Sequence, residues 1–135
     1  MNLILCVDDN GGMCFHHRRQ SQDRILREQL LALAGNTPLW MNSYSSRQFP
    51  EPLPASVCVD EAFLEKAGPT DYCFVEDQDI SSYADRICRL VLFKWNRSYP
   101  ADVFPALDLS GFTLVETMDF AGFSHERITK EIYVR

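Results

Sequence analysis

Short apolar runs recur along the chain, and each one predicts a buried strand. The first, Leu3 to Val7, is too short to form a helix and is followed by a glycine-containing turn, so it predicts a strand that is buried on both faces. Four similar runs follow it, and two further strand-like segments come near the end of the chain. These six further strands are expected at residues 38–41, 57–59, 72–75, 89–95, 113–117 and 127–134.

One segment changes from this pattern to a helical period. Leucines recur at spacings of four and three residues from Leu26 to Leu33, with charged residues off the apolar stripe, which predicts an amphipathic helix. Ser21 or Asp23 is the expected N-cap, and Gly35 can take the left-handed position that ends the helix. Shorter helices are expected at 43–49, 61–67 and 80–87, with Ser43, Asp60 and Ser81 or Ser82 as caps.

The order of these elements predicts one α/β domain over residues 1–135. Strands alternate with helices and then two strands follow one another, which predicts a mostly parallel central sheet with antiparallel edge strands and helices on both faces. Ligands of such sheets bind beyond the carboxyl ends of the strands. Asp8, Asn42, Glu76 and Asn96 directly follow four of the expected strands, so we expect a pocket at this edge.

Charge and cysteine content limit the function classes. A formal net charge of -6 at pH 7 argues against nucleic-acid binding, although the basic patch from His16 to Arg19 is either a solvated loop or a docking surface. No apolar run reaches the roughly 18 residues of a membrane span, so no membrane association is expected. The five cysteines are odd in number and widely spaced, which favours reduced core thiols and a cytoplasmic location over a disulfide framework.

Several segments together resemble the dihydrofolate reductase family. Residues 3–13 are similar to the family's first strand and the acidic turn that opens its mobile active-site loop, and residues 38–45 are similar to its second strand and the helix start that holds a cofactor phosphate. The segments 90–96, 99–105, 112–117 and 124–135 follow the family's closing strand order, including a similar Phe-Pro loop. The resemblance covers nearly all of the chain and implies a dihydrofolate reductase-like fold.

The chain departs from the family where the cofactor phosphates bind. The family uses adjacent glycines after its central strand, and this chain has Glu76-Asp77-Gln78-Asp79 at that place. Two like charges about 4 Å apart repel by roughly 4 kcal/mol at an effective dielectric constant near 20, which is about a thousandfold in affinity. At the second phosphate site, Asn42, Ser43 and Tyr44 supply no cation. We therefore expect that the protein is not a competent NADPH-dependent reductase.

The stretch from Trp95 to Asp102 offers an aromatic ring, an amide, a guanidinium and a carboxylate, which suits a planar polar ligand. Alternatively, Arg97 and Asp102 form a salt bridge while Trp95 and Tyr99 pack. We expect a protein that binds a small polar or planar molecule at the carboxyl edge of the sheet, with its oligomeric state left open. The candidate ligand-binding residues are Asp8, Asn42, Tyr44, Trp95, Asn96 and Arg97.

The first enzymatic alternative is a divergent NAD(P)H-dependent reductase of the pterin type. Asp23 is the nearest match to the family's pterin-binding carboxylate, so the resemblance would make it the proton donor. Arg18, Arg19 or Arg24 would then replace the missing phosphate contacts. NADP is a candidate cofactor only under this alternative.

The second alternative is a metal-dependent hydrolase or nuclease that uses Asp8, Asp9 and a histidine. Neighbouring carboxylates can differ in proton affinity and so act as acid and base, but Asp-Asn-Gly is also a turn sequence. Cys14, His16, His17 and His125 lack the spacing of a zinc site, so no metal is expected. The segment Ser124-His125-Glu126 has the residue types of a hydrolase triad, but consecutive residues do not form such a relay, so a polar turn is expected.

Overall fold

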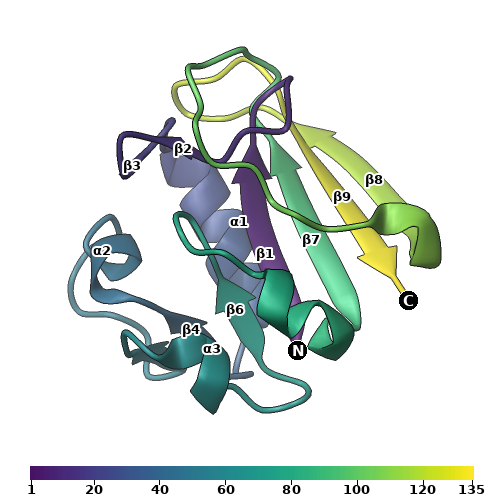
Figure 1. Cartoon of the computed structure of the whole chain (residues 1–135). Helices are drawn as coiled ribbons and strands as arrows, with labels where there is room; N and C mark the ends of the chain where they lie inside the picture. The colour runs from purple at the N-terminus through teal and green to yellow at the C-terminus, as the bar shows by residue number, and fades with distance from the viewer.

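The computed structural model describes all residues 1–135 and contains one seven-stranded sheet in the order β5-β4-β6-β1-β7-β9-β8 (Figure 1). The strands from β5 to β7 are parallel, β9 is antiparallel to β7, and β8 is antiparallel to β9. The expected mostly parallel sheet with antiparallel strands at one edge is therefore confirmed. The strands are β1 (Asn2–Val7), β4 (Leu39–Met41), β5 (Val57–Val59), β6 (Tyr72–Phe74), β7 (Arg89–Lys94), β8 (Thr113–Phe120) and β9 (Ile128–Val134).

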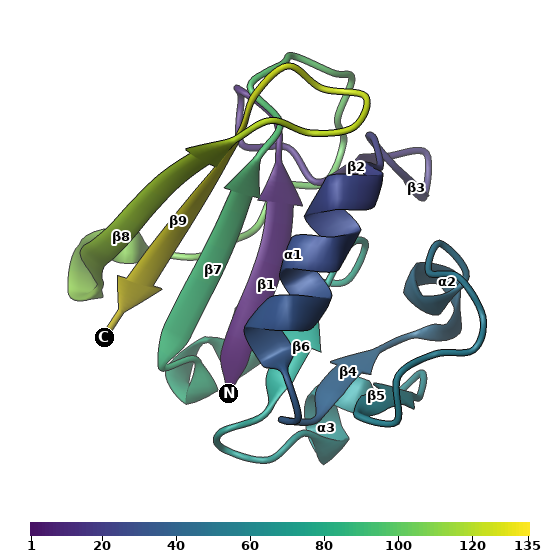
Figure 2. The ribbon, with the colours of Figure 1, turned by 180° about the vertical axis from the view of Figure 1, so that it is seen from behind.

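Helices cover both faces of this sheet. The long helix α1 (Arg24–Ala34) lies on one face, and α3 (Phe63–Lys66) and the 3₁₀ helix η1 (Ser81–Arg86) lie on the other (Figures 1 and 2). Asp23 is the N-cap of α1 and Gly35 ends it at a φ of 57°, as the leucine pattern and the flanking residues predicted.

The short helices differ from the sequence predictions at their ends. Helix α2 (Ser43–Ser46) is capped by Asn42 rather than Ser43, because the amide oxygen of Asn42 accepts a hydrogen bond from the Ser45 N–H at 2.9 Å. Neither Ser81 nor Ser82 caps η1; instead the Asp79 carboxylate accepts from the Ser81 N–H at 2.9 Å. Several side chains near each terminus could supply the same hydrogen bond, so the sequence alone did not select between them.

A two-stranded hairpin was absent from the sequence predictions. It pairs β2 (Cys14–Phe15) with β3 (Arg18–Arg19), and its turn residues His16 and His17 have φ values of 50° and 62°. Strands of two residues show no alternation of apolar and polar side chains, and His16-His17 is not one of the Asn-Gly, Asp-Gly or Gly-Gly pairs that mark a tight hairpin turn. The hairpin is important because it carries Arg19 toward the carboxyl ends of the parallel strands.

The sheet separates two apolar cores. Leu3 and Leu5 of β1 face the core that includes Phe63 of α3, whereas Ile4 faces the core that includes Leu30 of α1. Alternate side chains of β1 thus enter opposite cores, which confirms the prediction that this strand is buried on both faces.

None of the helices has the length and apolar character needed to cross a lipid bilayer. All five cysteines are free, but they are not uniformly core residues. Cys14 and Cys73 are buried, Cys6 and Cys58 are partly exposed, and Cys88 is exposed. The expectation of core thiols is therefore wrong for Cys88, which lies just before β7 on the surface.

Candidate functional site

Polar side chains gather in two places at the carboxyl ends of the parallel strands. The Arg19–Glu76 cluster lies beyond β4 and β6, and the His125 network lies near the loop between β8 and β9. The cluster consists of Arg19, Tyr44, Gln48 and Glu76, and the network consists of Ser21, Asp23, Tyr99, Ser124 and His125.

Arg19 forms a bidentate ion pair with Glu76. The distances are 3.0 Å from Arg19 Nε to Glu76 Oε2 and 3.2 Å from Nη2 to Oε1. Gln48 donates a third hydrogen bond to Glu76 Oε1 at 3.0 Å, and the Glu76 side chain is only 7% exposed. The Glu76 carboxylate is thus compensated inside the protein and does not face solvent.

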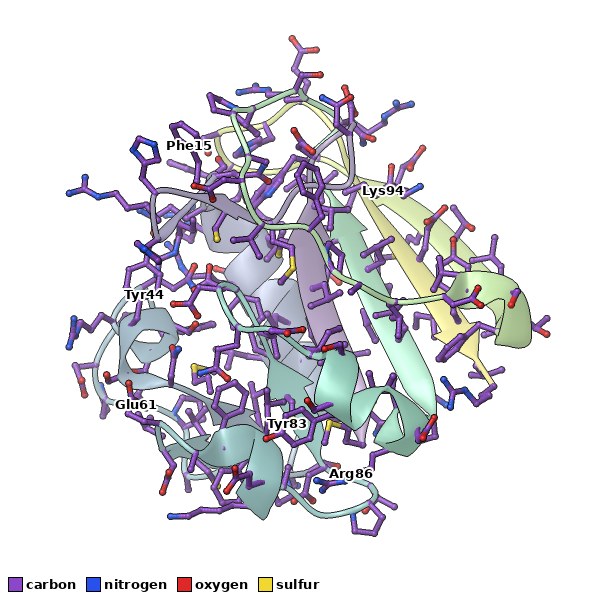
Figure 3. All side chains as sticks on the ribbon, viewed as in Figure 1. Phe15, Tyr44, Glu61, Tyr83, Arg86 and Lys94 are labelled. Atoms are coloured by element: carbon purple, nitrogen blue, oxygen red, sulfur yellow. The ribbon has the colours of Figure 1, made fainter.

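Tyr44 holds the hairpin against α2. Its hydroxyl accepts a hydrogen bond from the Arg19 N–H at 2.9 Å, and the Arg19 guanidinium lies 4.3 Å from the centre of its ring. Figure 3 shows Tyr44 projecting from the α2 region on the side of the hairpin. Sequence reasoning named Tyr44 and Glu76 but left the partner of Glu76 open, since 57 residues separate Arg19 from Glu76.

Asn42 and Asp8 are occupied by local structure. Asn42 donates to Asp77 Oδ1 at 3.2 Å in addition to capping α2. Asp8 accepts hydrogen bonds from the N–H groups of Asn10, Gly12 and Tyr99 at 3.0, 2.8 and 2.9 Å. Both side chains are buried, and Asp8 fits the turn interpretation better than an acid or base that is open to substrate.

Asp23 is the centre of the second group. One carboxylate oxygen accepts from the N–H groups of Ile25, Leu26 and Phe123, and the other accepts from Ser124 and from His125 Nδ1 at 2.9 Å. Burial alone would raise the pKa of Asp23, but the hydrogen bonds from Ser124, His125 and Phe123 outweigh it and hold the pKa well below its usual range.

Gly122 makes this arrangement possible. A Cβ atom at that position would lie 2.7 Å from Asp23 Oδ2 and 3.0 Å from the backbone oxygen of His125. Any larger residue would therefore push the β8–β9 loop away from the start of α1.

The second ring nitrogen of His125 faces two hydroxyl groups. His125 Nε2 lies 2.9 Å from Ser21 Oγ and 3.4 Å from the Tyr99 hydroxyl. The Trp95 ring stacks on the imidazole with ring centroids 4.7 Å apart and the planes inclined by 29°. Sequence reasoning missed this network because it considered His125 with Ser124 and Glu126 and with the residues of a zinc site, but not with Ser21 or Asp23.

Trp95, Asn96 and Arg97 lie beside this network. Trp95 is only 3% exposed, so it packs, as one of the two interpretations held. Asn96 donates to Thr129 Oγ1 at 2.9 Å, and Arg97 donates to the backbone oxygen of Ser124 at 3.4 Å. The Arg97–Asp102 salt bridge of the alternative interpretation does not form; Asp102 instead accepts a hydrogen bond from the His16 N–H at 3.1 Å.

The six predicted ligand-binding residues therefore do not form one pocket. Asn42 and Tyr44 belong to the side of the sheet near Glu76, whereas Trp95, Asn96 and Arg97 belong to the side near His125. Asp8 lies at the end of β1, between the two sides. Their role in ligand binding stays a prediction.

Three clefts flank these groups. One of them, of about 380 Å³, is lined by Trp95, Asn96, Arg97, Glu126 and Arg127, so three of the predicted ligand-binding residues share a cleft. The hairpin cleft has a volume of about 490 Å³ and is lined by residues of the β2–β3 hairpin together with Gln20, Tyr99 and Pro100, none of them acidic. The arginine cleft, of about 440 Å³, lies between α1 and the segment after α2. Its lining residues are Arg24, Arg27, Glu28, Leu31, Arg47, Gln48, Phe49 and Pro50.

The chain contains no group of three or more His, Cys, Asp or Glu side chains that could hold a metal ion. His16, His17 and Cys14 lie in or beside the hairpin, whereas His125 binds Asp23. The residue types that suggested zinc are thus spread over separate places.

No family model matches the chain, and no curated protein sequence matches it. Among solved structures, the chain is similar to dihydrofolate reductase from Enterococcus faecalis complexed with NADP(H) and RAB-propyl. The two share 12% sequence identity and superpose with a TM-score of 0.70 over 99% of this chain and 95% of that one. At this identity the similarity concerns the fold, which supports the resemblance predicted from the strand order. The chain therefore has a dihydrofolate reductase-like α/β fold.

Proposed function

We propose that this protein binds a small anion with a flat or apolar body in the arginine cleft, and that it does not act as an NADPH-dependent reductase. The observation that carries the proposal is the grouping of three arginines around this cleft with a single acidic residue, Glu28, in a chain whose net charge is -6.

The side chains of the cleft are available for a ligand. No carboxylate forms an ion pair with Arg24, Arg27 or Arg47. Arg27 only donates to the Gln22 amide at 3.2 Å, and Arg24 lies over the Phe123 ring at 4.2 Å. Guanidinium groups bind carboxylate or phosphate oxygens in bidentate fashion, so they suit an anionic ligand group.

The remaining lining of the cleft suits the body of such a ligand. Leu31 of α1 is partly exposed, and Phe49 and Pro50 lie opposite on the segment after α2. Apolar walls with a few polar groups at the rim are typical of small-molecule sites. The cleft lies next to the carboxyl edge of the sheet through Arg24, which begins α1, and Gln48, which contacts Glu76.

The Arg19–Glu76 cluster supports the second part of the proposal, that the protein is not an NADPH-dependent reductase. The fold family places cofactor phosphates after the strand that corresponds to β6, and here Glu76 and Asp77 occupy that segment. Glu76 binds Arg19 and Gln48, and Asp77 accepts from Asn42. A phosphate would have to displace the guanidinium and would then meet an uncompensated carboxylate, so these residues do not fit NADP(H).

The state of Asp23 also speaks against reductase chemistry. A proton donor needs a raised pKa near the working pH, whereas six hydrogen-bond donors stabilise the charged form of Asp23 and lower its pKa. The metal-dependent hydrolase alternative has no support from side-chain grouping.

A thermal-shift and calorimetric screen tests the proposal. We expect aromatic carboxylates such as 4-aminobenzoate, or acidic pterins and nucleotides, to raise the melting temperature, and we expect NADPH not to bind at its cofactor site. The Arg47→Gln variant should weaken binding about tenfold, since a charge-assisted hydrogen bond is worth roughly 1.5–3 kcal/mol. Arg89→Gln, at the amino end of β7, is the matched control. Failure of every anion to bind, or equal binding by Arg47→Gln, would contradict the proposal.

A further inference from the structure

We propose that Ser21 is a nucleophile activated by His125 and Asp23, and that it accepts acyl groups from small esters that carry a negative charge. This inference does not depend on the arginine cleft. It rests on a relay of three side chains that come from two distant parts of the chain, namely the segment before α1 and the loop before β9.

The hydrogen-bond directions within the relay are determined by Asp23. An ionised carboxylate only accepts hydrogen bonds, so the proton of the neutral imidazole lies on Nδ1 and is donated to Asp23 Oδ2 across 2.9 Å. Nε2 then carries the lone pair, and it accepts the hydroxyl proton of Ser21 across 2.9 Å. This is the order of groups that activates a serine in hydrolases of unrelated folds.

The relay is held rigidly and is shielded from solvent. The side chains of His125 and Asp23 are 3% and 0% exposed, and Trp95 stacks on the imidazole. Asp23 is fixed by the N–H groups of Leu26 and Ser124 in addition to the imidazole. A general base whose ring cannot rotate keeps its lone pair aimed at the serine hydroxyl.

Ser21 itself lies at the boundary with solvent. It is partly exposed in the segment between β3 and α1. The hairpin cleft adjoins it through Gln20, the preceding residue, and through Tyr99, whose hydroxyl lies 3.4 Å from His125 Nε2. Arg18 in this cleft forms no ion pair, whereas Arg19 is paired with Glu76, and no lining residue is acidic, which favours an ester with a negative charge.

The reaction proceeds in two steps. Ser21 Oγ forms a bond to the acyl carbon while its proton moves to His125 Nε2; the bond from the acyl carbon to the ester oxygen then breaks, and the departing alcohol takes that proton. In a slower second step, water attacks the acyl group on Ser21, His125 takes a proton from the water and returns it to Ser21 Oγ, and a carboxylic acid leaves, so the acylated protein accumulates first.

The test uses 4-acetoxybenzoate and phenyl acetate, a charged and a neutral acetyl donor. We expect the intact mass of the protein to increase by one acetyl group, peptide mapping to place it on Ser21, and the charged ester to react faster. Ser21→Ala should abolish the modification, and His125→Gln should slow it at least about 100-fold, the lower range for a general base. Ser110→Ala, an exposed serine in the 3₁₀ helix Leu109–Gly111, is the control.

A second variant keeps His125 and Asp23 intact. Ser21→Cys places a thiol next to Nε2, and we expect it to react with iodoacetamide at least tenfold faster than the exposed Cys88 of the same protein. The proposal would be overturned if the folded protein were not acetylated or were acetylated on another residue. It would also be overturned if folded His125→Gln were acetylated as fast as the wild type, or if the introduced thiol were alkylated slowly.

Discussion

His125 Nδ1 lies 2.9 Å from Asp23 Oδ2, although the two residues are 102 positions apart in the chain. Asp23 caps α1 at the same time, so one carboxylate joins the first long helix to the loop that precedes the last strand. Its contacts therefore serve the stability of the fold as well as the proposed activation of Ser21.

We predict that Asp23→Ala destabilises the protein by about 2–4 kcal/mol, because it removes a helix cap and leaves buried donors without an acceptor. Phe123 and Ser124 would lose the acceptor for their N–H groups. Urea denaturation gives the free energy of unfolding of each variant. Asp85→Ala is the control, since Asp85 is exposed on η1 and should change that free energy little. A loss no larger than that of the control would show that the network has no structural role.

The same carboxylate predicts how stability depends on pH. The pKa of Asp23 is lower in the folded protein than its ordinary value of 3.8, because its hydrogen bonds outweigh the opposing effect of burial. A depressed pKa stabilises the fold above the unfolded-state pKa, and this contribution is lost as the pH falls below 3.8 toward the folded-state value. Asp23→Asn has no carboxylate to protonate. We therefore expect its urea midpoint to decrease less steeply below pH 3.8 than the midpoint of the wild type. Parallel curves for the two proteins would contradict the assignment.

Arg19 and Glu76 should show strong energetic coupling. Arg19→Met alone leaves the buried Glu76 carboxylate without its cation, and breaking a buried ion pair in this way costs about 3–5 kcal/mol. The double variant Arg19→Met with Glu76→Leu removes both charges, so we expect much of this loss to be restored. A double-mutant cycle of denaturation free energies measures the coupling. Additive losses would mean that the pair does not hold the hairpin.

The five thiols should react at very different rates with Ellman's reagent. Burial raises the pKa of Cys73 to about 12, and its side chain is 0% exposed, so this thiol should react only after denaturant is added. Cys88 is exposed and should react first. Stopped reactions followed by peptide mapping identify the modified cysteines. Early modification of Cys73 in the folded protein would show that β6 is more open than the structure indicates.

Much of the fold follows from local patterns. The stripe from Leu26 to Leu33 predicts α1, and Asp23 and Gly35 mark its ends, because capping and helical period depend on residues a few positions apart. The doubly buried strand β1 is predicted from five consecutive apolar residues. The hairpin of residues 14–19 could not be predicted in this way, because contacts with Tyr44 and Glu76 hold it rather than a local turn sequence.

The candidate site depended far more on tertiary structure. Sequence order identified Asp8 and Asn42 at strand ends, but their hydrogen bonds to nearby backbone groups emerged only in the folded chain. Ser124, His125 and Glu126 do not form a relay together, whereas Ser21, His125 and Asp23 do. A relay needs distances near 3 Å between side chains, and spacing along the chain says little about them once the segments come from different elements.

Apart from the hairpin of residues 14–19, the sequence by itself determined the strands and main helices of this protein, their order and hence the α/β fold, because helix period, strand burial and turn residues act over short distances along the chain. Only the tertiary structure decided that Arg19 pairs with Glu76, that three arginines surround one cleft, and that His125 lies between Ser21 and Asp23. These relationships join residues from separate elements, and packing of the whole chain is what sets the distances between them.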